Sequence, residues 1–214
     1  MMSREDLPGR LERAGARYLQ EALKRTRNLS LRVPVIPALF STLRILAVAP
    51  VLYLLSSGKG PVAVFWLALF AALTDYLDGW TARRMRCKTY GGKILDFAAD
   101  KVFLIVVLLA QAAAGQVEAV VSGIVAGYHL LIILVLTVVS WGVSTPVVPL
   151  PTGEKLVVIL SYLLVVTVAG RAAFPGKAIY STLGGVCGIL AVLSVLIGLW
   201  SYLRLTKRIL GKFE

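Results

Sequence analysis

The sequence predicts an all-α polytopic membrane protein with six transmembrane helices and an N-terminal amphipathic helix at the membrane surface. Hydrophobic residues make up 58% of the 214 residues, and the mean hydropathy is +0.81. This apolar share is well above that of an ordinary soluble domain. The apolar residues also form blocks near the roughly 20 residues that a spanning helix needs. The blocks cover residues 35–57, 61–82, 94–115, 117–141, 155–174 and 178–203.

Ahead of the first block, residues 3–27 place Leu7, Leu11, Ala14, Tyr18 and Ala22 at helical spacing, with basic residues around the other side. The pattern is typical of an interfacial helix, and a solvated charged helix is an equally good interpretation. The first block lacks a small-residue cleavage site, so we expect it to be kept as a span. We therefore divide the chain into a cytoplasmic amphipathic segment, residues 1–33, and a membrane domain, residues 34–214.

Short turns rich in Gly, Pro or Ser separate the six blocks. They read SSGKGP, TYGG, AAAGQ, STPVVPLPTGE and FPGK. Connections this short leave no room for a soluble domain, and the turn between the second and third blocks predicts that these two helices are antiparallel neighbours. Glycines in the last block allow close helix contact within or between chains. They are Gly184, Gly185, Gly188 and Gly198.

Basic residues predict the orientation. Of the 23 Lys and Arg, 18 lie at one end of the blocks, and only Lys59, Arg171 and Lys177 lie at the other. The positive-inside rule then places both termini and the loop after the second helix in the cytoplasm, in a multi-pass protein of the cytoplasmic membrane. The net charge is +12, and the basic residues responsible for it border the membrane spans. We therefore expect anionic lipid, and no nucleic acid, as the partner. Cys87 and Cys187 suggest neither a disulfide nor a metal pair.

Four aspartates stand in LTDYLDGWTARRMRCKTYGGKILDFAADK, residues 73–101, beside long apolar runs. Asp75 and Asp78 are three residues apart and Asp96 and Asp100 are four apart, so each pair shares a helix face. The short connection brings the two helices together. We therefore expect the four carboxylates to converge below the cytoplasmic headgroups, about 12 Å from the end of the second helix by helix rise.

Packed carboxylates in a medium of reduced dielectric repel one another. One or two bound divalent cations would offset this repulsion. Oxygen ligands without a nearby His or paired Cys favour Mg²⁺ or Mn²⁺ and leave Ca²⁺ open. Two ions sharing carboxylates would clamp the oxygens of a phosphoryl group. A single such aspartate is as readily a packing contact or a proton-relay group, but four converging aspartates are hard to explain that way.

The residues next to the aspartates indicate a diphosphate site. Gly79 and Ala82 are small enough for a ligand to approach the helix, and Arg83 offers a bidentate fork for phosphate. Thr89 adds a hydroxyl, and Gly92 a second point of close approach.

This segment resembles the signature of the CDP-alcohol phosphotransferase (CDP-alcohol phosphatidyltransferase) family, D-x2-D-G-x2-A-R-x8-G-x3-D-x3-D. All eight fixed positions match: Asp75, Asp78, Gly79, Ala82, Arg83, Gly92, Asp96 and Asp100. The resemblance implies a six-helix, usually dimeric membrane enzyme that moves a substituted phosphate from a CDP-alcohol to a second alcohol and releases CMP. It also implies that the four aspartates bind the metals, that Asp100 is the general base, and that Gly79, Arg83 and Thr89 touch the donor.

A second stretch, PALFSTLR, is similar to the PNxLTxxR of phosphatidylglycerophosphate synthases. Pro37, Ser41 and Arg44 are in register, and Ala38 replaces the usual Asn. Ser41 and Arg44 are therefore candidate donor contacts. A lone arginine in an apolar helix needs a partner, for which we expect an active-site carboxylate or a phosphate. With FAADK after the third aspartate, the resemblance implies CDP-diacylglycerol and glycerol 3-phosphate as substrates.

One departure concerns the acceptor. Phosphatidylglycerophosphate synthases commonly carry an Arg-Glu pair in the fourth span, where this chain has VAGYHLLIIL. A phosphorylated acceptor would then depend on basic residues at the cytoplasmic face, which serve equally well as membrane anchors. These candidates are Arg84, Arg86, Lys88, Lys93 and Lys155. Inositol or its phosphate, or phosphatidylglycerol in a cardiolipin synthase, are the alternative acceptors.

Two alternatives of another class use the same residues, namely a transporter with intramembrane acids and a non-catalytic relative with an assembly role. A proton relay does not require small residues around an arginine-rich turn, and a non-catalytic relative would be free to lose at least one of the four aspartates. We expect His129 to be neutral and hydrogen-bonded between helices, and Lys101 to neutralise Asp100 or Asp96 one turn away.

Overall fold

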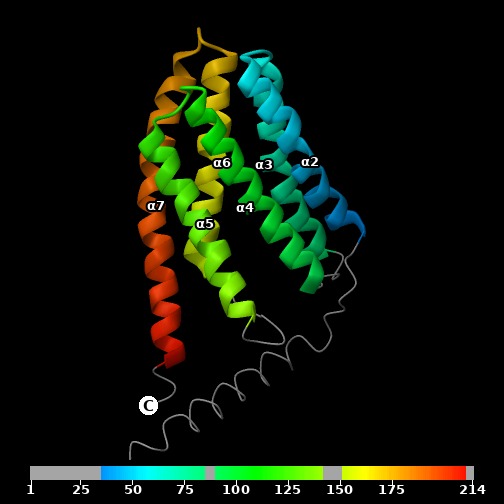
Figure 1. The fold of residues 1–214 in the computed structure, drawn as a ribbon, viewed down its shortest axis with the longest axis vertical. Helices are drawn as coiled ribbons and strands as arrows, with labels where there is room; N and C mark the ends of the chain where they lie inside the picture. The colour runs from blue at the N-terminus through cyan, green and yellow to red at the C-terminus, as the bar shows by residue number, and fades with distance from the viewer. Residues whose placement is uncertain (1–34, 85–89, 142–150, 211–214) are drawn as a thin grey trace, which may run out of the picture.

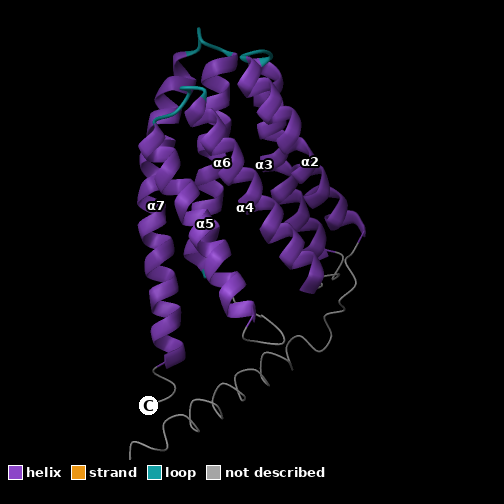
Figure 2. Ribbon diagram, viewed as in Figure 1, coloured by secondary structure: helices purple, strands orange, loops and turns teal. Residues whose placement is uncertain are grey.

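The computed structural model describes residues 35–84, 90–141 and 151–210, and within these ranges it contains helices and turns but no strand (Figure 2). The six described helices are α2 (Val35–Ser57), α3 (Pro61–Arg84), α4 (Tyr90–Ala113), α5 (Ala119–Trp141), α6 (Thr152–Ala173) and α7 (Ala178–Leu210). The all-α class is therefore confirmed. The expected amphipathic helix at residues 3–27 lies outside the described residues.

The helix limits follow the turn residues. Gly58 and Gly60, between α2 and α3, have φ angles of 64° and 63°, a left-handed conformation that glycine adopts without strain. Pro61 then opens α3 at a position where no intrahelical N–H donor is needed. α4 begins at Tyr90 instead of 94, and α7 continues to Leu210 instead of 203. Both extend past their apolar blocks because the backbone hydrogen bonds of a helix can continue where its hydropathy falls.

Three of the described helices are long and apolar enough to cross a membrane. Their apolar spans are Leu39–Ser57, Gly153–Ala173 and Ala178–Arg204. Shorter apolar stretches lie in α3, at Pro61–Asp75, and in α5, at Ala119–Val135. Charged residues interrupt the apolar sequence where α3 ends and α4 begins, which is where the aspartates lie. The chain is a membrane protein, and hydropathy by itself supports three of its six described helices as spans.

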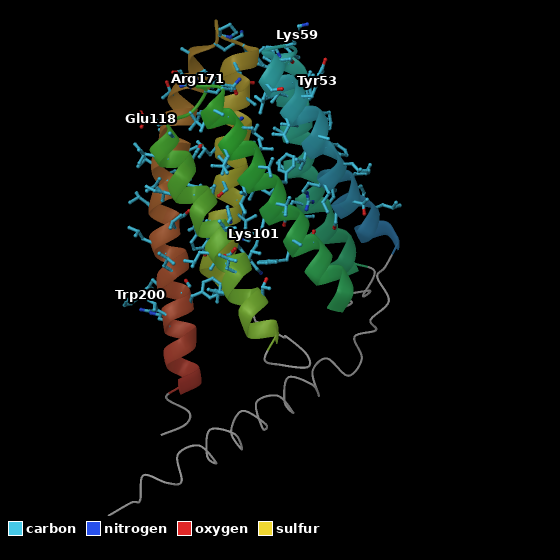
Figure 3. All side chains as sticks on the ribbon, in the orientation of Figure 1. Tyr53, Lys59, Lys101, Glu118, Arg171 and Trp200 are labelled. Carbon is cyan, nitrogen blue, oxygen red and sulfur yellow. The ribbon has the colours of Figure 1, made fainter. Side chains whose placement is uncertain are left out.

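Successive helices run in opposite directions (Figure 1), so the end of α3, the start of α4, the start of α6 and the end of α7 lie at one end of the bundle. Arg83 and Arg84 in the last turn of α3, Lys93 at the start of α4, Lys155 at the start of α6 and Arg204 near the end of α7 belong to that end. Lys59 and Arg171 lie at the other end, whereas Lys101 lies inside the bundle (Figure 3). The basic residues on the described helices are thus divided between the two ends of the bundle, and the orientation of the bundle in the membrane stays a prediction.

The core combines many alanine and valine side chains with larger leucine, phenylalanine and tyrosine side chains, and α4 packs against α2, α5 and α6. Ala68 and Ala71 of α3 and Val107 of α4 are fully buried. On the outside, large apolar side chains such as Leu46 and Ile189 are more than 60% exposed. An apolar outer face is unfavourable in water and is the face that lipid requires.

Candidate metal centre

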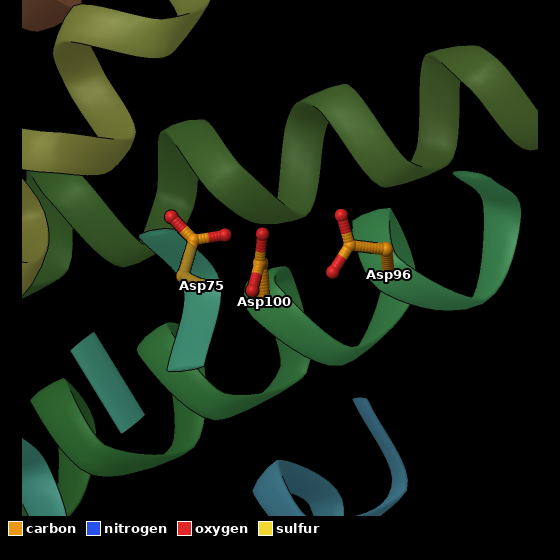
Figure 4. A group of neighbouring side chains, drawn as sticks. All are labelled: Asp75, Asp96 and Asp100. Carbon is orange, nitrogen blue, oxygen red and sulfur yellow. The ribbon is translucent and has the colours of Figure 1, made fainter. Parts of the chain in front are cut away.

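The carboxylates of Asp75, Asp96 and Asp100 come together at one point in the bundle. One oxygen from each lies within 4.8 Å of the others. Figure 4 shows the three side chains directed toward a common space, with Asp100 between Asp75 and Asp96 in that view. α3 supplies Asp75, and α4 supplies the other two from successive turns of one face. Asp100 is buried, and the other two are half-buried.

The expectation that the two helices carrying the aspartates pack directly as antiparallel neighbours was wrong: within the described residues, α3 and α4 have little direct contact and are joined through two other helices. α3 and α4 each pack against α2 and against α6. Ala71 on α3 and Ala99 on α4, both fully buried, keep the side chains near the aspartates small. The carboxylate cluster is therefore surrounded by four helices, and α2 and α6 can both send side chains into it.

Arg44 of α2 supplies the positive charge of this cluster. It is fully buried, its Nη1 donates to Oδ1 of Asp100, and the same nitrogen lies 3.5 Å from Oδ1 of Asp96. Its Nη2 lies 3.4 Å from Oγ1 of Thr74. Ser41, one turn earlier on α2, has its hydroxyl 3.5 Å from Oδ1 of Asp96. The lone intramembrane arginine thus has carboxylate partners.

The described residues fit a hard divalent cation. Among the described side chains of the cluster, three carboxylates and one guanidinium have a formal charge of −2, which one divalent cation would balance. One oxygen of each carboxylate lies within 4.8 Å of the others, and a cation with metal–oxygen distances of about 2.0–2.6 Å can bind oxygens that are this close together. The residues that would hold the cation are Asp75, Asp96 and Asp100. Buried carboxylates in excess are otherwise costly.

A second buried polar cluster lies next to the carboxylates and joins α4, α5 and α6. Lys101 forms an ion pair with Glu154, and Tyr128 donates its hydroxyl hydrogen to the other oxygen of Glu154. The Nδ1 of His129 is 2.9 Å from Nζ of Lys101, and its Nε2 is 3.0 Å from Oγ of Ser161. His129 is fully buried and hydrogen-bonded between helices, as predicted.

The prediction of the residue that pairs with Lys101 was wrong. The structure pairs Lys101 with Glu154 of α6, where the sequence suggested Asp100 or Asp96 of its own helix. One residue along an α-helix turns the side chain by about 100°, so Lys101 points away from the face that carries Asp96 and Asp100. Among the described side chains, the carboxylate cluster has its cationic partner on α2, in Arg44.

Comparison with known proteins identifies the family. The sequence profile described as CDP-alcohol phosphatidyltransferase matches residues 34–200. The chain belongs to the CDP-alcohol phosphatidyltransferase family. This confirms the resemblance, and the carboxylates of Asp75, Asp96 and Asp100 occupy positions of the family signature.

Two relatives carry the name CDP-diacylglycerol–glycerol-3-phosphate 3-phosphatidyltransferase. The protein from Aquifex aeolicus (strain VF5) is 40% identical over 74 residues, which is 35% of this chain and 41% of the relative. The protein from Pseudomonas fluorescens is 39% identical over 77 residues, which is 35% of this chain and 39% of the relative. The chain thus aligns with about two fifths of the length of these relatives.

For several predicted site residues of this CDP-alcohol phosphatidyltransferase family member, the structure does not describe the side chain, so their roles remain predictions. Asp78, Gly79, Ala82, Arg83 and Arg84 are in the last turns of α3, and Gly92 and Lys93 are in the first turn of α4, but their side chains are outside the described part. Arg86, Lys88 and Thr89 lie outside the described residues altogether. Lys155 is described and is exposed on the first turn of α6.

Three residues in or beside the cluster were missed by the sequence analysis: Thr74, Glu154 and Tyr162. Glu154 carried a usable signal, because a lone acid at the start of an apolar block needs a partner. Thr74 and Tyr162 carried none, since a threonine or tyrosine in a membrane helix is ordinary.

Proposed function

We propose that this protein is an integral membrane transferase that moves the phosphatidyl group of CDP-diacylglycerol to glycerol 3-phosphate and releases CMP, in phospholipid biosynthesis. The observation that carries the proposal is the buried cluster of Asp75, Asp96 and Asp100 with Arg44 among them. Membership of the CDP-alcohol phosphatidyltransferase family supports the reaction class. The names of the two relatives support the choice of substrates.

In this proposal Asp75, Asp78, Asp96 and Asp100 hold one or two divalent cations, Mg²⁺ or Mn²⁺. When bound, such cations neutralise charge on the transferring phosphate and on the departing CMP. Asp100 takes the proton of the acceptor hydroxyl. The acceptor oxygen forms a bond to the phosphorus that carries the diacylglycerol, and the bond from that phosphorus to the oxygen of CMP breaks.

The donor would lie along the end of α3 and the start of α4. Gly79, Ala82 and Gly92 leave space beside the helix backbones, while Arg83 and Thr89 bind the diphosphate. Ser41 and Arg44 complete this side of the site from α2. Both are buried against Asp96, which suggests that they act on the donor through the aspartates as much as by direct contact.

The acceptor site is proposed at the end of the bundle that carries the basic residues. A phosphorylated acceptor needs cations, and the candidates are Arg84, Arg86, Lys88, Lys93 and Lys155. Lys155 supports this location because it is exposed and follows the buried Glu154. Lys101 is not a candidate for binding the acceptor phosphate, because its charge is already balanced by Glu154.

We further propose that all six described helices cross the cytoplasmic membrane, with both termini and the carboxylate cluster facing the cytoplasm. The segregation of basic residues to one end of the bundle supports this orientation. Residues 1–33 would form the amphipathic segment on the cytoplasmic surface, ahead of a membrane domain of residues 34–214. By resemblance to the family, the functional unit in the lipid bilayer is a homodimer.

The test is CMP release from CDP-diacylglycerol by the purified full chain in detergent with Mg²⁺, with each acceptor offered separately. We expect stimulation by glycerol 3-phosphate and none in the Asp100→Asn variant. Stimulation by phosphatidylglycerol alone would make the protein a cardiolipin synthase, and stimulation by inositol or its phosphate would reassign the acceptor. No CMP release with any acceptor would favour a transporter or an assembly protein.

A further inference from the structure

Asp100 is fixed by side chains from the two helices that both α3 and α4 pack against. Nη1 of Arg44, on α2, donates to its Oδ1. The hydroxyl of Tyr162, on α6, donates to the same Oδ1 across 3.1 Å. Among the described residues, both donors to Asp100 therefore engage one oxygen of the carboxylate.

The ring of Tyr162 is held in place independently of this hydrogen bond. Tyr162 is 4% exposed, and its ring stacks on that of Phe103 with 6.0 Å between the centroids and 23° between the planes. Phe103 is itself fully buried on α4. Stacking by a buried neighbour leaves the tyrosine hydroxyl few other positions, so the hydrogen bond to Asp100 is formed in advance.

We propose that Tyr162 is a positioning residue of the metal centre: together with Arg44 it anchors Oδ1 of Asp100, so that Oδ2 is presented to a divalent cation shared with Asp75 and Asp96. The inference rests on the proposed function only in requiring a metal centre at these carboxylates. It gives a role to a tyrosine outside the family signature.

The physical need for an anchor follows from the charges. The terminal torsion of an aspartate is soft, and Asp100 has a carboxylate on either side of it (Figure 4). Repulsion from Asp75 and Asp96 favours rotation of the Asp100 carboxylate away from the cluster. Two donors that pull on Oδ1 oppose this rotation. Side chains that orient a metal ligand in this way typically contribute 10- to 100-fold to metal affinity.

The decisive experiment measures Mn²⁺ binding by electron paramagnetic resonance in the substrate-free, purified full chain, in the wild type and in Tyr162→Phe. This variant removes one oxygen atom and keeps the ring that stacks on Phe103. We expect its affinity for Mn²⁺ to fall about 10- to 100-fold. The matched control is Tyr128→Phe, which removes another buried hydroxyl bonded to a carboxylate, that of Glu154, outside the cluster. Its affinity for Mn²⁺ is expected to stay within about twofold of the wild type.

Mn²⁺ affinity in Tyr162→Phe within about twofold of the wild type would overturn the proposal. An equal loss in Tyr128→Phe would also overturn it, because the effect would then be a general loosening of the bundle. A wild type that binds no Mn²⁺ removes the premise and overturns it too. A wild type that binds Mn²⁺ but releases no CMP refutes the proposed function alone, and the comparison between the two variants still decides the role of Tyr162.

Discussion

The ion pair between Lys101 and Glu154 predicts that the stability of the bundle depends on both residues jointly. Both are at most 2% exposed. Glu154 accepts from Lys101 on one oxygen and from Tyr128 on the other, and His129 is the second partner of Lys101. Lys101→Met leaves the carboxylate with a single neutral donor. Glu154→Gln removes the carboxylate with which the ammonium is paired.

The expected magnitudes follow from this burial. Removing one partner of a buried ion pair costs about 3–5 kcal/mol, because the remaining charge has lost its compensation. The double variant Lys101→Met with Glu154→Gln carries no charge at this site, and its free energy of unfolding is expected within about 2 kcal/mol of the wild type. The sum of the single costs then exceeds the cost of the double variant by at least about 3 kcal/mol.

The assay is reversible unfolding by SDS in mixed micelles, followed by circular dichroism, on the wild type, both single variants and the double variant. Lys155→Met is the matched control, because Lys155 is a neighbouring but exposed lysine, and its change is expected to stay below about 0.5 kcal/mol. A cost below about 1 kcal/mol for Lys101→Met would refute the reasoning. So would a double variant whose cost equals the sum of the single costs.

Three further predictions test packing, topology and metal dependence. A Cβ atom at Gly198 would lie 2.4 Å from Oη of Tyr128, so Gly198→Ala is expected to lower the free energy of unfolding by about 1–3 kcal/mol in the SDS assay. Gly185→Ala, which adds a methyl group where space is open, should change it by less than about 1 kcal/mol. In membrane vesicles, maleimide should label Cys87 from the cytoplasmic side only and leave the buried Cys187 unlabelled; labelling of Cys87 from the opposite side would contradict the orientation. CMP release should stop in EDTA and return with Mg²⁺, and undiminished release in EDTA would rule out the metal centre.

The helix face that Asp96 and Asp100 share could be predicted because it depends on local geometry alone. Spacings of three and four residues fix which side chains share a helix face, whatever the rest of the fold. The spacing therefore predicted a shared face for Asp96 and Asp100, and the structure places Asp75 of the preceding helix beside them. Arg44 was also predictable as an arginine in need of a carboxylate, because a buried charge must be paired.

Periodicity, hydropathy and motif spacing act over short stretches of chain, and they were enough to predict the all-α membrane class, the order of the six described helices, the family and the helix face that Asp96 and Asp100 share. The fold was needed to bring Asp75 beside them, through the packing of α3 and α4 on α2 and α6. It was needed also to pair Lys101 with Glu154, 53 residues away, and to bring Tyr162 to Asp100, 62 residues away. Such pairs depend on which helices pack together and on the rotation of each about its axis. Those quantities are set by the fit of many side chains at once, and no single stretch of sequence contains them.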